Sequence, residues 1–140
     1  MVQSGTASVV AGSTIIALNT ASLSGPDCAG TFTTAQTNLI GKGDGCTGFT
    51  DAVKRDKVGS IASPINPKLG KLAANGGPTK TLALLAGSPA IDKAGAAPCD
   101  TAKDQRGVKR PKGGACDIGA FESHGFTLVK SGGDHQQTVN

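Results

Sequence analysis

Residues 75–122 constrain the fold of this chain more than any other segment. The run reads NGGPTKTLALLAGSPAIDKAGAAPCDTAKDQRGVKRPKGGACDIGAFE, is dense in glycine and proline, and is nearly free of aromatic residues. Two cysteines, Cys99 and Cys116, bracket its second half. Such a segment buries too little apolar surface to offset its own conformational entropy. We therefore expect it to dock on structure that is already folded, as the closing element of an extracellular scaffold and not as a catalytic domain.

The composition of the whole chain favours short strands. A length of 140 residues fits one domain. With no Trp, no Tyr and only 4 Phe, the core must consist of thin layers of Val, Ile, Leu and Ala. The 21 Gly and 7 Pro interrupt the chain too often for a helical bundle. The sequence therefore predicts an all-β fold with tight turns.

Two strand groups are spaced as in a β-solenoid. Residues 7–20 predict one or two strands with a bend at Gly12, and residues 31–41 predict a second pair. Asn19 and Asn38 each lie beside apolar residues of these groups, and asparagine side chains can form hydrogen-bonded ladders at solenoid corners. The spacing of about twenty residues matches one solenoid turn. Further strands are predicted at residues 79–85 and 116–122.

The four cysteines predict two local disulfides. None belongs to a CxxC pair; Cys28 and Cys46 flank one Gly-rich loop, and Cys99 and Cys116 flank another of similar size. An even number of cysteines around irregular loops favours an oxidising compartment. We therefore expect an extracellular or cell-surface protein, although four cysteines allow three pairings.

Zinc is the rival explanation for the cysteines. Only His124 and His135 are available to complete such a site, and both lie in the tail at unsuitable spacing. We therefore expect no metal and no cofactor.

The ends of the sequence bear on export. The first twenty residues lack the pattern of a signal peptide, and no apolar stretch is long enough to span a membrane. If the disulfides form, we expect the export signal and further structure to lie upstream of Met1. The tail, residues 124–140, is expected to be a linker or the start of a following module.

The net charge of +4 is distributed over loops. One basic cluster, at residues 54–57, is interrupted by Asp56; the other contains Lys109, Arg110 and Lys112. Neither is interleaved with aromatic residues that stack on bases, so we expect no specific nucleic-acid partner. Solvated loops are the expected role, with Lys109, Arg110 and Lys112 kept as candidates for binding an anionic polymer.

The acidic residues are expected to be structural. Asp92 lies in GSPAIDKAG, where a carboxylate can accept backbone N–H bonds in an Asx-type turn, and no DxDxDG calcium loop is present. Arg106 or Arg110 is expected to meet Asp117 or Glu122 across the loop between the last two cysteines. Paired acids beside an arginine also suit polysaccharide cleavage, but no Tyr or Trp platform for a sugar ring exists. No residue is predicted to be catalytic. The predicted structural polar residues are Asn19, Asn38, Asp92, Asp104, Arg106, Asp117 and Glu122.

Several of these motifs together resemble a known family. The run NPKLGKLAANGGPTKTLALLAGSPAIDKAG, followed by DQRG and CDIGAFE, is similar to the C-terminal part of bacterial right-handed parallel β-helix proteins, a segment called the choice-of-anchor Q domain. The upstream STIIALNTA and NLIG motifs resemble the last coils of those pectate-lyase-like proteins. The resemblance covers residues 7–123. It departs at residues 63–67, where SPINP replaces an acidic residue before a PLLG-like motif. It implies an exported or surface-anchored protein and no established catalytic residue.

Taken together, the residues and the resemblance predict three parts. Residues 1–60 are the last coils of a right-handed parallel β-helix with a disulfide loop, residues 61–123 are a Gly/Pro-rich cap over its open end, and residues 124–140 follow. The expected function is a non-enzymatic structural module of an exported bacterial surface or adhesin-like protein. Its expected partners are upstream β-helix coils of the same protein and cell-surface glycans. The alternative is the C-terminal part of a polysaccharide lyase or glycoside hydrolase of the β-helix class.

Overall fold

The computed structural model describes residues 9–22, 25–50, 55–124, 128–130 and 137–139. Within these residues the regular elements are all strands, and no helix is present. The predicted all-β fold is therefore confirmed.

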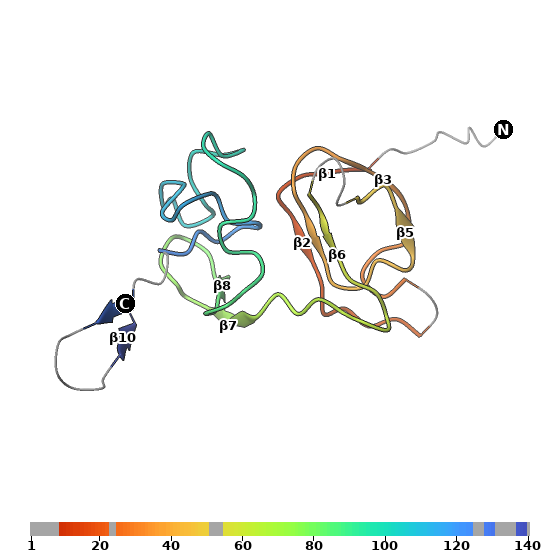
Figure 1. Ribbon diagram of the computed structural model, residues 1–140, viewed down its shortest axis with the longest axis horizontal. Coiled ribbons are helices and arrows are strands. Elements are labelled where there is room, and N and C mark those ends of the chain that lie inside the picture. Colours follow the sequence, from red (N-terminus) through yellow and green to blue (C-terminus); the bar gives the residue numbers. More distant parts are fainter. Residues whose placement is uncertain (1–8, 23–24, 51–54, 125–127, 131–136, 140) are drawn as a thin grey trace.

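The described residues between positions 9 and 60 form two parallel sheets that the chain enters alternately (Figure 1). The first sheet has the order β1-β3-β5 and the second has the order β2-β4-β6. Ile15 of β2 lies opposite Leu39 of β4, and Leu39 lies opposite Lys57 of β6. We call this region the strand stack. Its strands are β1 (Val9–Ala11), β2 (Ile15–Ile16), β3 (Gly30–Thr34), β4 (Leu39–Ile40), β5 (Cys46–Thr47) and β6 (Lys57–Val58).

Residues 61–123, which we call the C-terminal region, contain one antiparallel pair and long irregular loops. The pair is β7 (Leu69–Ala73) with β8 (Thr81–Leu84), joined through Gly76 and Gly77, whose φ values of 89° and 78° suit glycine. The strand predicted over residues 79–85 is thus present in shortened form. A further antiparallel pair, β9 (Leu128–Lys130) with β10 (Gln137–Val139), lies in the tail.

The strand predicted at residues 116–122 is wrong. Cys116 makes only an isolated bridge with Gly95, and Gly119 has a φ of 99°, which interrupts extended backbone. The backbone groups of this segment form hydrogen bonds with several separate loops instead of with one strand. For example, the Ile118 N–H donates to the Ala90 carbonyl at 2.9 Å. Its apolar residues fill the core without joining a sheet.

One apolar core joins the two regions. Leu39, Leu84, Ala90 and Ile118 form its buried centre, and Leu39 and Ile118 are fully buried. Successive side chains of a strand point to opposite faces. Because Leu39 contacts residues of the C-terminal region, Ile40 faces the opposite side of its sheet, the interior of the strand stack.

The C-terminal region therefore packs against the side of the strand stack (Figure 1). That it also covers the open end of the stack stays a prediction. The Gly119 N–H donates to Ser13 O at 2.8 Å, and Ile15 packs against the shared core. Both of these contacts involve the first pass through the sheets, not the last. The physical reason is that the outer face of the β2-β4-β6 sheet carries Ile15 and Leu39, which offer apolar surface that strand edges lack.

Candidate functional site

A ladder of polar groups runs through the strand stack at the position just before β2, β4 and β6. The Thr14 N–H donates to Asn38 Oδ1 at 3.1 Å, and the Asn38 N–H donates to Asp56 Oδ1 at 2.8 Å. Asn38 Nδ2 also donates to Asp56 Oδ1 at 3.0 Å and to Thr34 Oγ1 at 2.9 Å. Asn38 and Asp56 are almost completely buried. The ladder satisfies polar groups that would otherwise be costly inside the stack.

Asn38 belongs to this ladder, but Asn19, the other asparagine considered for a corner ladder, does not. Asn19 is exposed, and its N–H and Nδ2 donate to Asp27 Oδ1 at 2.9 and 3.0 Å. The sheet register aligns Asn38 with Thr14 and Asp56 instead. Asp56 was missed because it lies within a basic run. The signal for it was its place one residue before a short strand, as for Asn38.

Asp104 is the centre of a buried ionic cluster in the C-terminal region. Its Oδ2 contacts Arg106 Nη2 at 2.6 Å and accepts the Glu122 N–H at 2.9 Å, while its Oδ1 accepts the backbone N–H groups of Arg106 and Val108. Burial by itself raises the pKa of Asp104, but these hydrogen bonds outweigh it and hold the pKa below its usual value. Arg106 also lies over the ring of Phe121, 3.5 Å from its centroid.

Glu122 forms the second half of the cluster. Its Oε2 lies 3.2 Å from Arg110 Nη1, and its two oxygens accept the N–H groups of Lys112 and Asp117. Burial raises the pKa of Glu122, and the charge of nearby Asp117 raises it further, despite the hydrogen bonds and Arg110. The expected contact of an arginine with Glu122 is thus present, through Arg110. Arg106 reaches only the Glu122 carbonyl, at 2.5 Å.

Asp92 and Asp117 connect the loops around this cluster. The Asp92 N–H donates to Asp117 Oδ1 at 2.7 Å, and Asp92 Oδ1 accepts the Ala115 N–H at 2.9 Å. Asp117 Oδ2 accepts the Ser123 N–H at 2.6 Å. These carboxylates hold backbone segments that have no sheet to pair with, as an Asx-type role at Asp92 implies.

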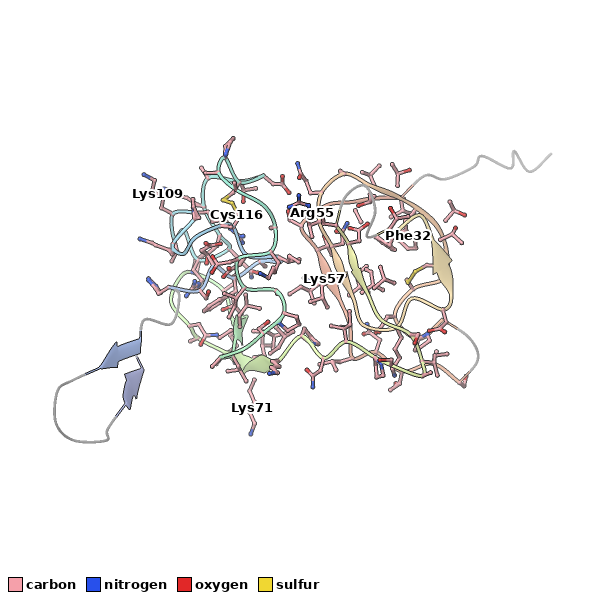
Figure 2. The ribbon with its side chains drawn as sticks, in the orientation of Figure 1. Phe32, Arg55, Lys57, Lys71, Lys109 and Cys116 are labelled. Carbon is pink, nitrogen blue, oxygen red and sulfur yellow. A yellow bond between two sulfur atoms is a disulfide. The ribbon has the colours of Figure 1, made fainter. Side chains whose placement is uncertain are left out.

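Arg110 is not part of an exposed basic patch, which corrects its assignment as an anion-binding candidate. Its side chain is buried, with Nη1 donating to Asp117 O at 2.8 Å and Nη2 donating to Gly119 O at 2.5 Å. Lys109 and Lys112 are exposed, and Lys109 points outward from the C-terminal region (Figure 2). Two lysines without the central arginine make a weak anion site.

Both predicted disulfides are present. Cys28 pairs with Cys46 inside the strand stack, and Cys99 pairs with Cys116 in the C-terminal region (Figure 2). Each links residues of nearly equal separation, 18 and 17 positions. The first fastens β5 to the loop before β3, and the second closes the loop that contains Asp104.

A groove of about 820 Å³ lies between the two regions. Residues 12–17 form one wall, and the other wall includes Leu72 and Leu82 of the β7–β8 pair, residues 99–101 and 103–105, and residues 116–121. Leu72 and Leu82 are 62% and 42% exposed, so the groove has an apolar lining open to solvent. Its charged residues are Lys80, Asp100 and Lys103 at the rim, with buried Asp104, Arg110 and Asp117 deeper in the wall.

Within the described residues, no group of three or more His, Cys, Asp or Glu side chains is arranged to hold a metal ion. The same residues include no helix with the length and apolarity needed to cross a membrane.

Comparisons with models of known protein families, with curated proteins and with solved structures find no match to this chain.

Proposed function

We propose that this chain is a non-enzymatic structural module of an exported bacterial surface or adhesin-like protein. In this proposal the strand stack is the terminal part of a right-handed parallel β-helix that continues upstream in the same protein. The C-terminal region acts as a lateral brace that ties successive strands together. Cell-surface glycans are a further proposed partner of the assembled surface.

The observation that carries the proposal is the shared core. Leu39 packs with Ile118 and Leu84, so the brace holds the outer face of a sheet whose strands come from separate passes of the chain. A solenoid is stabilised mainly by contacts between neighbouring repeats. A brace that spans two repeats opposes their separation, which is what a stalk or surface scaffold requires.

The buried acids support a structural role over a catalytic one. Asp104 and Glu122 accept backbone N–H groups from five different residues in all, and each is paired with its own arginine. A general acid or base must reach a substrate proton. Carboxylates committed to internal donors in this way hold loops in place.

The disulfides support the exported location. Two pairs that close loops of irregular structure are typical of secreted proteins, because reducing compartments keep cysteines as thiols. Export of the chain to an oxidising compartment should yield no free thiols on purified, unreduced protein. Four free thiols would contradict this part of the proposal.

The functional test is incubation of the full chain with pectin, alginate and a broad panel of other glycans. The proposal predicts no release of uronate or reducing ends. Release that disappears in Asp100→Asn, a groove-rim variant whose acid is exposed, would overturn the structural proposal in favour of polysaccharide cleavage. Release that persists in the variant would also overturn it, by placing catalysis elsewhere in the chain.

A further inference from the structure

The groove lies beside an unpaired strand edge. In the order β2-β4-β6, strand β2 pairs only with β4 among the described residues, so its other edge carries backbone groups without a sheet partner there. Residues 12–17, which include β2, line the groove. Exposed strand edges are templates for further pairing unless something blocks them.

The apolar interface of the brace continues into the groove. Ile15, Leu39 and Lys57 form one row on the outer face of the sheet. Leu39 is fully buried because it has a neighbour on each side in the row and the brace above it, whereas Ile15 is only partly buried. Leu72 and Leu82 of the brace line the groove together with Ile15 and are exposed. On the β2 side, the apolar interface between the brace and the sheet therefore has room for one more strand.

The opposite edge of the same sheet is different. There the row ends in Lys57, and a lysine on an edge strand opposes further pairing and apolar packing. The two ends of this row of side chains therefore differ: the row is apolar at the β2 edge and charged at the β6 edge. Only the β2 edge combines an apolar row with a groove.

The polar ladder also has an available hydrogen-bond acceptor at its β2 end. At each step the backbone N–H of one pass donates to the side-chain oxygen of the next: Thr14 to Asn38, and Asn38 to Asp56. Thr14 Oγ1 donates to Gly12 O at 2.8 Å, which leaves its lone pairs able to accept. The N–H of a preceding pass can therefore donate to the Thr14 hydroxyl oxygen.

We infer that the groove receives the strand of a preceding parallel pass, which pairs with the free edge of β2. Its outward side chain, in the row of Ile15, is apolar and fills the space between Ile15, Leu72 and Leu82. The residue before that strand donates its N–H to Thr14. The inference rests on the proposed structural role and specifies how the next repeat is held by both the sheet and the brace.

The test adds one pass to the chain. A copy of residues 13–36, with serine in place of the copied Cys28, is inserted after Gly12, so that the copied strand falls in register with β2. Methyl NMR with a soluble paramagnetic agent measures the exposure of Leu72 and Leu82. We expect their solvent-induced relaxation to be largely lost in the extended chain. Leu85, 48% exposed and outside the groove, is the matched control and should be unchanged.

A second probe covers the case in which the inserted pass fails to fold. A peptide copying residues 13–18 is titrated into the unmodified chain, beside a control peptide with Ile15→Lys. Shifts at the Ile15 amide and at the Leu72 and Leu82 methyls with the first peptide alone support the inference.

Three outcomes would overturn the inference. The first is a folded insert that leaves Leu72 and Leu82 fully exposed. The second is an unfolded insert together with a peptide that causes no shift or shifts only β6. The third is a groove that responds to oligogalacturonate, or to self-association of the chain, and not to the peptide. Each differs from glycan cleavage by the unmodified chain, which would overturn the proposed function instead.

Discussion

The strand stack and the C-terminal region hold their backbones in a fixed conformation by different interactions. In the strand stack, the register of Ile15 with Leu39 repeats backbone pairing from pass to pass, and one buried acid, Asp56, completes a ladder. The C-terminal region has only the β7–β8 pair and organises its loops around Asp104 and Glu122. The contrast shows that a segment poor in apolar side chains can obtain a fixed shape from carboxylates saturated with backbone N–H groups.

The largest expected effect is at the ionic cluster. Asp104→Asn removes the charge that pairs with Arg106, leaving a buried guanidinium without its partner, and such changes cost about 3–5 kcal/mol. Urea unfolding monitored by circular dichroism gives the free energy of unfolding. The control, Asp44→Asn, changes an exposed carboxylate that accepts a single backbone N–H from Ile61, and should cost far less. Equal losses of unfolding free energy in the two variants would contradict a stabilising role for the ionic cluster.

Removing each disulfide in turn compares how much stability the two regions gain from a cross-link, because the two loops have nearly the same length. Cys28→Ser with Cys46→Ser, and Cys99→Ser with Cys116→Ser, each open a loop of similar size, so chain entropy predicts a loss of about 3 kcal/mol for either pair. Thermal unfolding of both double variants beside the parent measures the loss. Strongly unequal losses of stability would show that one region depends on its disulfide much more than the other.

The ladder is expected to have an intermediate effect. Asp56→Asn keeps one side-chain oxygen for Asn38 and Thr34 but turns the other acceptor, which holds the Thr50 N–H at 3.0 Å, into a donor. An unsatisfied buried donor costs about 1–3 kcal/mol. Amide hydrogen exchange should show loss of protection centred on β4 and β6. Loss centred instead on the C-terminal region would contradict the separate roles of the two regions.

The smallest effect is on pH dependence. The lowered pKa of Asp104 stabilises the fold above the ordinary carboxyl pKa, and that stability is lost as pH falls through the folded value. The raised pKa of Glu122 has the opposite sign: stability is gained as pH falls through the raised pKa and is complete below the ordinary glutamate pKa of 4.5.

Unfolding curves from neutral to acidic pH test these signs. Relative to the parent, Glu122→Gln should remove the gain on acidification, so its stability should fall more steeply toward low pH. A variant whose pH profile runs parallel to that of the parent would show that Glu122 has the same pKa folded and unfolded.

The sequence predicted the local features better than the contacts between distant segments. Gly12 and the apolar pairs at residues 15–16 and 39–40 gave the short strands, because turn residues and β-branched or leucine side chains act locally. The loop spacing of the cysteines gave the disulfides. The docking of Ile118 on Leu39 depends on which strand face carries apolar residues after the passes are in register, and that is a property of the assembled sheet.

The candidate site shows the same division. The sequence predicted an arginine contact with Glu122, but it did not show that Arg110 is buried and that Asp104 pairs with Arg106, two residues away. Nothing in the local pattern separates Arg110 from its exposed neighbours Lys109 and Lys112. Burial decided their roles, and burial follows from the fold.

Methyl–methyl NOEs of selectively labelled protein test the central claim, that the C-terminal region braces the side of the strand stack. The account predicts cross-peaks that join Ile118 and Leu84 to Leu39 and Ile15, because these four side chains share one core. It predicts none from Ile118 or Leu84 to Val58, which lies in β6, the last strand of the strand stack, and is 40% exposed. Cross-peaks to Val58 without those to Leu39 would place the C-terminal region over the end of the stack and contradict the account.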